Sequence, residues 1–437
     1  MLARAIRRGF ALVAGRLPVL RIRDFRLLLA DRVLAPASFA FSLVGVSFAV
    51  LDQTHGSTAD LSYVLAAQIA PSLIFVLVGG VIADRIAPQK VIIAANIMMA
   101  VGEGTLGILV LAGHPALWQM IALECLTGTG MAVFYPASQA LLPRLVPPAL
   151  LQEASAISRL GMNGGQMGGA VLAGLFIAAI GHSGPGWALT ICGTGLLGTL
   201  PLMLALKVTG HDRTQQAGML RELREGWSEF RSHTWLWVIV LQFAVVLMAW
   251  YGAFSVLGPA VARAHLGGPA AWGVITGAES LGLIIGGVVS LRFSPRRPMR
   301  FVVLIGASIA LSPLSLAMLW PLPAICVSSF ALGIALEIMM IQWTVALARN
   351  IPADKLARVS SYDAFGSVMA MPVGAVIAGP VAAWAGVSVT QYWAAGLIVV
   401  ASALALIPRD IRQLRADQLA GPAAAPIGEP ALAGTAS

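Results

Sequence analysis

Long apolar runs, separated by short polar loops, constrain this chain more than any other feature of its sequence. Each run covers about 18–25 residues, the length that a helix needs to cross a hydrocarbon core about 30 Å thick. Transmembrane β-strands have about ten residues of alternating polarity, so a barrel does not fit. Charged residues make up 11% of the chain, against about 25% in soluble domains. The sequence therefore predicts an all-α polytopic membrane protein.

Twelve transmembrane helices are expected, in two six-helix bundles at 27–207 and 235–408. The predicted spans are 27–51, 61–82, 91–112, 117–141, 154–180, 186–207, 235–261, 270–291, 301–320, 323–347, 359–385 and 388–408. A cytoplasmic linker is predicted at 208–234, and a basic amphipathic segment at 1–26 is expected to lie on the membrane surface. The small, proline-rich tail at 409–437 is expected to be disordered.

Arginine and lysine alternate between the loops. They cluster in the N-terminal segment and in every second loop, and the other loops contain only Arg263. The positive-inside rule then places both termini and the linker in the cytoplasm, with the chain crossing a cell membrane (inner or plasma) an even number of times. The net charge of +9 is thus explained by topology, and we expect no nucleic-acid partner.

The two halves of the chain repeat. At a constant offset of 205, Gly169 matches Gly374, Gly174 matches Gly379 and Gly181 matches Gly386. A weaker match at an offset of 207 pairs Gly79 and Gly80 with Gly286 and Gly287. Both copies begin on the cytoplasmic side, so they are parallel repeats, an arrangement typical of two-bundle secondary transporters with a site between the bundles.

These features resemble the major facilitator superfamily. The stretch "VGGVIADRIAPQK" resembles that family's loop between spans two and three, with Gly80, Asp84, Arg85 and Lys90 at the matching positions, although Pro88 and Gln89 stand where the family usually has arginines. The resemblance implies that these four residues act in gating. Asp84 would close the cytoplasmic side by docking near Arg358 and Ser360 at the start of span eleven.

Two further stretches, "FYPASQALLPRLVPPALLQEASAI" and "LREGWSEFRSHTWL", resemble the branch of transmembrane secretion effectors, which includes enterobactin exporters and macrolide efflux pumps. In span five, "NGGQMGGAVLAG" resembles an exporter motif. Gly164, Gly168 and Gly169 fit it and are expected to pack helices closely, while Gly165 replaces the motif's proline. At Glu124 the family has an arginine, so the proton-handling role of that arginine does not transfer.

Acids within the spans are the candidates for proton coupling. They are Asp31, Glu103, Glu124, Glu279 and Glu337. A carboxylate inside a membrane is costly unless it is paired, protonated or wet, so each should face a cavity or a partner helix. The alternative for any one of them is a structural hydrogen bond. Counting along the spans, no base lies as deep as these glutamates, which favours cationic or neutral amphiphiles as substrates.

Amides and aromatic residues are the candidates for lining a substrate cavity. We expect Gln139, Gln166, Trp250, Tyr251, Gln342 and Trp343 to line it, although an aromatic residue of this kind more often belongs to the packed core or faces lipid. The three cysteines lie far apart inside apolar runs and the six histidines are scattered in loops. We therefore expect no disulfide, no metal site and no cofactor, and no ATP-binding loop is present.

The sequence thus predicts a secondary transporter rather than an enzyme. It favours proton-coupled efflux of small amphiphilic molecules (drugs, natural products or siderophores) by a monomeric antiporter of the kind that confers drug resistance. Its partners would be the lipid bilayer, protons and a small-molecule substrate. An importer or uniporter of a small metabolite is the alternative within transport. A polytopic membrane enzyme or assembly protein is the alternative from another class, and the absence of a catalytic cluster argues against it.

Overall fold

The structure is a computed structural model in which every described element is a helix. It describes residues 18–53, 57–85, 87–113, 115–206, 227, 230–290, 293, 295–351, 359–360, 362–363, 365–367 and 369–413, with the backbone alone for 72–85, 135 and 413. Most of the predicted N-terminal segment, linker and tail lie outside the described residues. So does Arg358.

The first half of the chain forms six long helices. They are α2 (Arg23–Gln53), α3 (Thr58–Arg85), α4 (Pro88–Ala112), α5 (Leu117–Leu145), α6 (Leu151–Ile180) and α7 (Gly184–Leu204). Short 3-10 turns, η1 (Pro18–Arg21), η2 (Pro148–Leu150) and η3 (Gly181–Ser183), precede α2, α6 and α7. Proline at the start of α4 suits the first helical turn, where no backbone N–H is needed.

The second half repeats this plan with more interruptions. Its elements are α9 (Thr234–Trp250), the π-helix η4 (Tyr251–Val256), α10 (Leu257–Val261), the π-helix η5 (Ala262–Leu266), α11 (Pro269–Ser290), α12 (Pro298–Ser308), α13 (Leu311–Ala317), α14 (Leu322–Asn350), α16 (Ala370–Ala385), α17 (Val387–Ala405) and α18 (Arg409–Gln413). The described residues contain ten helical stretches long and apolar enough to cross a membrane. One of these, Pro148–Leu204, holds both α6 and α7, and α3 adds a helix of 28 residues.

Prolines explain where the second half departs from straight helices. The predicted span 301–320 is broken between α12 and α13, because Pro313 has no N–H to donate to the carbonyl of Ile309. In span seven, Pro259 likewise leaves the carbonyl of Ser255 without its usual donor. The backbone there adopts the wider π register, and the N–H of Leu257 bonds to the carbonyl of Gly252.

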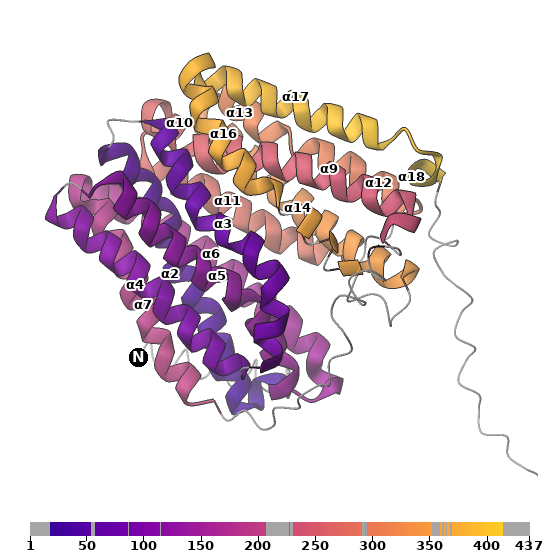
Figure 1. The fold of residues 1–437 in the computed structure, drawn as a ribbon, viewed down its shortest axis with the longest axis horizontal. Helices are drawn as coiled ribbons and strands as arrows, with labels where there is room; N and C mark the ends of the chain where they lie inside the picture. Colours follow the sequence, from indigo (N-terminus) through magenta and orange to yellow (C-terminus); the bar gives the residue numbers. More distant parts are fainter. Residues whose placement is uncertain are drawn as a thin grey trace, which may run out of the picture.

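The two halves form two groups of helices that touch at one end and diverge at the other (Figure 1). The C-terminal ends of α2, α4, α6, η5 and α16 lie at the joined end, and those of α5, α7, α11 and α14 lie at the spread end. Contacts between the halves run mainly through α6 with α11 and α3 with α16. The two pairs are equivalent by the internal repeat, so the halves are related by a pseudo-twofold axis.

Repeat-matched glycines make both contacts at the joined end. A Cβ at Gly174 of α6 would overlap the backbone of Pro269 and Gly273 in α11. A Cβ at Gly379 of α16 would overlap the carbonyl of Thr58 in α3. Within a bilayer, apolar side chains gain little by leaving lipid, so close approach of small residues is what holds helices together. One of the glycine pairs matched by the repeat, Gly174 and Gly379, therefore lies where the halves touch.

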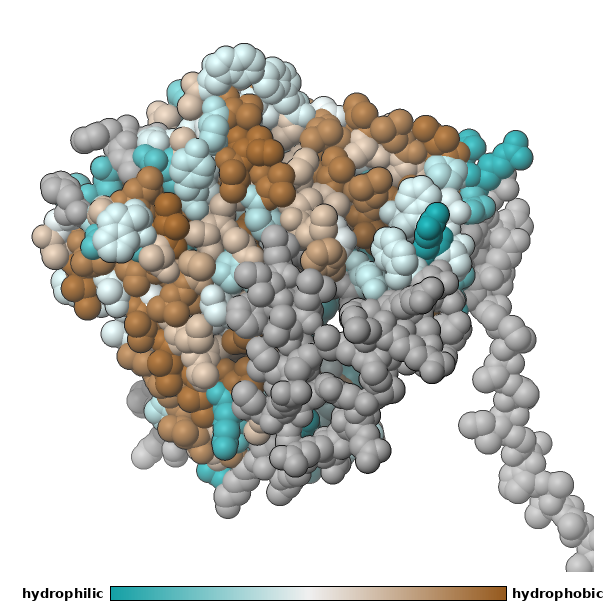
Figure 2. Space-filling model, in the orientation of Figure 1, coloured by the Kyte–Doolittle hydropathy of each residue, from teal (hydrophilic) through white to brown (hydrophobic). Residues whose placement is uncertain are grey.

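The outer surface is hydrophobic. Large apolar side chains on many helices are well exposed, including Trp384 at 82% and Val327 at 68%. Hydrophobic residues cover much of the face in Figure 2, and hydrophilic residues gather toward its edges. An exposed apolar surface of this extent would aggregate in water, so it is a lipid-facing surface.

Candidate functional site

An ion pair joins the two halves on the side of the spread end. Arg159 lies two turns into α6, and its Nη1 donates to the Oε1 of Glu337 in α14 at 2.5 Å. The arginine side chain is 59% exposed, whereas the glutamate side chain is only 12% exposed. Counting along the spans predicted no base at the depth of Glu337. That expectation is wrong for Glu337, because the side chain of Arg159 reaches its carboxylate.

The carboxylate of Glu337 rests against a glycine pair. A Cβ at Gly286 of α11 would lie 3.1 Å from the Cβ of Glu337, and a Cβ at Gly287 would lie 3.9 Å from its Oε1. These glycines are the repeat counterparts of Gly79 and Gly80. The backbone of α11 therefore forms the back of this site, and the side chain of Arg159 covers it from the water-accessible side.

Polar residues continue from Arg159 along one face of α6. Asn163 and Gln166 follow at intervals of four and three residues, which puts all three side chains on the same side of the helix. Gln166 is exposed and Asn163 is half-buried. A polar, solvent-accessible face on a helix of the half-to-half contact is suited to a solute that passes between the halves. Gln139 of α5 is also exposed.

Three acids of the first half are buried inside its own bundle. Glu103 in α4 accepts a hydrogen bond from the Oγ of Ser42 at 2.7 Å, and Glu124 in α5 accepts one from the Nε2 of Gln68 at 2.7 Å. Both side chains are fully buried, and each has a second carboxyl oxygen with no hydrogen-bond partner among the described residues. Among the described residues, neither acid takes part in an ion pair with a basic side chain.

Asp31 of α2 is the third buried acid of this half and has polar neighbours. It is 1% exposed and lies near Arg32, Asn96 and Thr199. The guanidinium of Arg32 points to the other helices, where it donates to the carbonyl of Ser138 at 2.7 Å and to the sulfur of Met162 at 3.1 Å. Glu279, in α11, is partly buried. The five predicted proton-coupling acids therefore fall in three separate surroundings.

Two of the predicted cavity residues are engaged in packing within the second half. Gln342 is 8% exposed and donates to the carbonyl of Phe293 at 3.0 Å. Trp343 is 3% exposed, and its indole N–H donates to Asp363 at 2.9 Å. Trp250 and Tyr251 lie where α9 passes into η4. Tyr251 belongs to a buried cluster with Leu61 and Leu65 of α3, so it packs against the other half.

The gating residues from the family motif are only partly described. Gly80, Asp84 and Arg85 lie in α3 where the structure describes the backbone alone, and Lys90 is exposed in the first turn of α4. Ser360, near the expected docking point of Asp84, is half-buried. The gating role of these residues stays a prediction.

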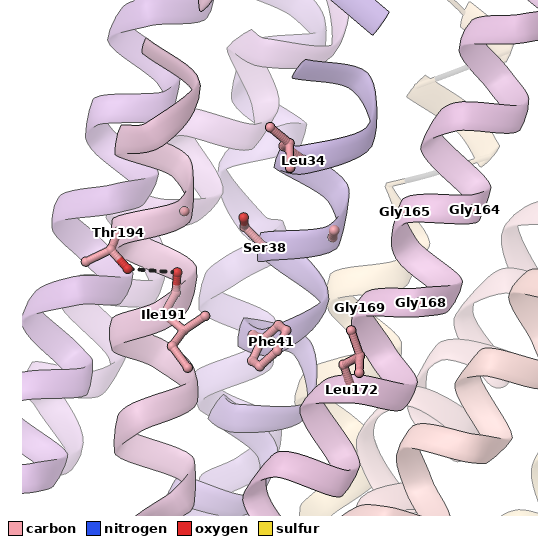
Figure 3. Close-up of a pocket in the computed structure, with 12 residues that line it drawn as sticks. Leu34, Ser38, Phe41, Gly164, Gly165, Gly168, Gly169, Leu172, Ile191 and Thr194 are labelled. Atoms are coloured by element: carbon pink, nitrogen blue, oxygen red, sulfur yellow. Dashed lines mark hydrogen bonds between the residues drawn. The ribbon is translucent and has the colours of Figure 1, made fainter. Parts of the chain in front are cut away.

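The glycines of span five differ in how closely other helices approach them. Gly169 packs tightly against the backbone of Ala37 in α2, whereas a Cβ at Gly164 or Gly168 would meet nothing within 4 Å. Those two glycines line a shallow groove of about 480 Å³ between α2, α6 and α7 (Figure 3). Phe41 and Leu172 also line it, and the hydroxyl of Thr194 bonds back to its own helix. The groove is therefore mainly apolar.

A second ion pair closes the joined end. Arg263 of η5 contacts the carboxylate of Asp52 at 3.0 Å and also donates to the carbonyl of Leu51, so the second half holds the end of α2. Sequence reasoning did not propose this contact. The sequence did contain an indication of it, because Arg263 is the only arginine or lysine in the set of loops on that side of the membrane.

These observations define a class of protein: an all-helical polytopic membrane protein of two pseudo-equivalent halves, whose described residues form a charged contact toward each end of the interface between the halves. The chain belongs to the Major Facilitator Superfamily, whose family model matches residues 33–321. It is therefore a secondary transporter of small molecules and not an enzyme, and the fold class predicted from the sequence is confirmed.

Similar proteins span nearly the whole chain. The enterobactin exporter EntS of Citrobacter koseri is 27% identical over 400 residues, covering 90% of this chain and 93% of the relative. EntS of Escherichia coli O1:K1 is 26% identical over 398 residues with the same coverage. Among solved structures, the nucleoside transporter NupG has a TM-score of 0.70 at 11% identity, covering 90% of this chain and 100% of that one. The xylose transporter XylE from E. coli, in an inward-open conformation, has a TM-score of 0.66 at 13% identity, with coverages of 88% and 96%.

Proposed function

We propose that this transporter exports small amphiphilic molecules by alternating access and that protons move inward in exchange. The observation that carries the proposal is the pair of charged contacts between the halves, Arg263–Asp52 at the joined end and Arg159–Glu337 toward the spread end. A transporter that alternates must break the first contact to open one side. The similarity to enterobactin exporters over 90% of the chain supports export as the direction.

The distribution of basic residues supports an orientation with the spread end in the cytoplasm. Lys90, Arg144, Arg297 and Arg349 all lie near that end, and Arg263 lies at the joined end. By the positive-inside rule, both termini are then cytoplasmic and the described conformation receives its substrate from the cytoplasm.

Glu337 is the proposed proton carrier. Among the described candidates it is the one in an ion pair, and its arginine partner is well exposed to solvent. Protonation of the carboxyl group removes the attraction to Arg159, so proton binding changes a contact between the two halves. Glu103 and Glu124 are sealed inside one bundle, where a proton has no equally direct effect on the interface.

The test measures substrate flux in proteoliposomes with an imposed pH gradient. Candidate substrates come from a compound panel that is first screened for accumulation in a deletion strain. Export by antiport predicts that substrate moves against the proton flow. Substrate that moves with the protons would establish an importer instead.

The Glu337→Gln variant should lose the response to the gradient but keep energy-independent exchange, because glutamine keeps hydrogen bonding and cannot titrate. Glu103→Gln is the matched comparison, since it changes an acid with no contact to the other half. A wild-type response in Glu337→Gln would exclude this residue as the carrier.

A further inference from the structure

The ion pair between Arg159 and Glu337 has no equivalent in the internal repeat. At the offset of 205, Arg159 corresponds to Ala364, so the equivalent helix of the second half lacks the charge. The arginine of this ion pair is 59% exposed and the glutamate 12% exposed, so solvent screens the attraction and the pair contributes less to stability than a fully buried one. Neither the architecture nor stability explains why this pair is present.

The two members of the pair are unequally placed. Glu337 is 12% exposed and is backed by the glycines of α11, whereas Arg159 projects from the polar face of α6. The guanidinium group of Arg159 is linked to α6 by a side chain with several rotatable bonds. It therefore contacts the carboxylate of Glu337 as a bound cation would, and a change of side-chain rotamer can remove it without any movement of the helices.

We propose that Arg159 is a tethered cation that occupies Glu337 until a cationic group of the transported molecule displaces it. The substrate class is then amphiphiles with a single positive charge. This inference rests on the proposed export function and names the substrate class of the same site. Because a cation of the substrate replaces one cationic partner of the carboxylate by another, and the displaced guanidinium is 59% exposed and can be solvated by water, the exchange costs little.

The competition also accounts for exchange with protons. A proton, the guanidinium of Arg159 and a substrate cation all require the same carboxylate, so only one of them is bound at a time. Mutual exclusion of proton and substrate is what an antiporter needs. An anionic substrate would instead bind the guanidinium, and protonation of Glu337 would then favour its binding, which leads to cotransport. Export driven by inward protons therefore selects the cationic class.

The test compares two probes of the same shape and opposite charge, tetraphenylphosphonium and tetraphenylborate. Their binding to the purified full chain is measured in nanodiscs, with protein-free discs as background and no gradient present. Arg159→Gln should bind tetraphenylphosphonium about two- to fivefold more tightly, which corresponds to the loss of an exposed ion pair. Arg159→Lys keeps a tethered cation and should restore an affinity close to that of the wild type.

Two further variants complete the design. Glu337→Gln should weaken tetraphenylphosphonium binding about tenfold, in line with loss of a partly buried charged partner. Arg349→Gln is the charge-matched control, because Arg349 is exposed in the last turn of the same helix, α14. It should leave both affinities unchanged.

The opposite pattern overturns the proposal. If Arg159→Gln leaves tetraphenylphosphonium binding unchanged, or weakens tetraphenylborate binding instead, then Arg159 is an anion site or a passive residue. Because binding is measured without a gradient, these outcomes are independent of the flux experiment. The binding experiment tests the competition at Glu337, and the flux experiment tests the direction of transport.

Discussion

Loss of the charged contact at the joined end should shift the transporter toward conformations that open there. Arg263 is 37% exposed and Asp52 is 26% exposed, so the ion pair itself contributes at most about 1 kcal/mol. The bond from the same guanidinium to the carbonyl of Leu51 adds a charge-assisted hydrogen bond, which we discount for its partial exposure. Together we expect Arg263→Gln to cost the closed state about 1–2 kcal/mol, a change of about 5- to 30-fold in the conformational equilibrium.

Distances between spin labels measure this shift directly. One label pair at Ser183 and Ala264 reports on the joined end, and a second pair at Gln152 and Ala348 reports on the spread end; all four positions are exposed. In Arg263→Gln the long-distance population should grow at the first pair and shrink at the second. Arg263→Lys keeps the charge and should show a smaller change.

A double-mutant cycle separates the ion pair from other effects of the substitution. If Asp52 is the partner that matters, Asp52→Asn and Arg263→Gln combined should shift the populations by less than the sum of the single shifts. Unchanged distance distributions in Arg263→Gln would refute the reasoning, because the contact would then hold nothing closed.

Three other predictions concern packing, gating and topology. Gly379→Ala should lower the thermal unfolding midpoint, since a Cβ there overlaps the backbone of α3 and forced overpacking costs about 1–3 kcal/mol. Gly396→Ala is the matched control, because a Cβ there meets nothing within 4 Å. Equal midpoints for the two variants would contradict the packing argument. Asp84→Asn should reduce transport with expression retained, and an unchanged rate would remove the gating role. Single cysteines at His55 and Arg221 should react with an impermeant reagent from opposite sides of the membrane; reaction of both from outside would exclude the twelve-span topology.

The fold was largely predictable because it follows from local patterns. Apolar runs set the spans, and the register of repeated glycines placed Gly174 and Gly379 at equivalent positions, where the structure has the half-to-half contacts. The break at Pro313 was not predicted. Hydropathy does not distinguish a continuous helix from two shorter ones, and a proline alone does not either, because α2 continues through Pro36 and α16 through Pro380.

The charged site was less predictable because it depends on pairs distant in the sequence. Arg159 and Glu337 are separated by 178 positions, and no local pattern reports which helices lie side by side. Side-chain length matters as well, since counting residues along a span locates Cα atoms and not guanidinium groups. Gln342 and Trp343 show a third limit, because their hydrogen-bond partners, Phe293 and Asp363, lie in other segments of the chain.

The close contact of α6 with α11 at Gly174 can act as a pivot, so that a rotation there moves the far end of α6. Gly174, where the backbones meet, lies 15 residues from Arg159 along the same helix, which is about 22 Å at 1.5 Å per residue. A rotation of one half by about 10° around that crossing would displace Arg159 by about 4 Å. This displacement is larger than the 2.5 Å that separates the guanidinium from Glu337. A small rotation at the joined end is therefore enough to form or break the ion pair between Arg159 and Glu337. The distance along α6 between Gly174 and Arg159 determines how small that rotation can be.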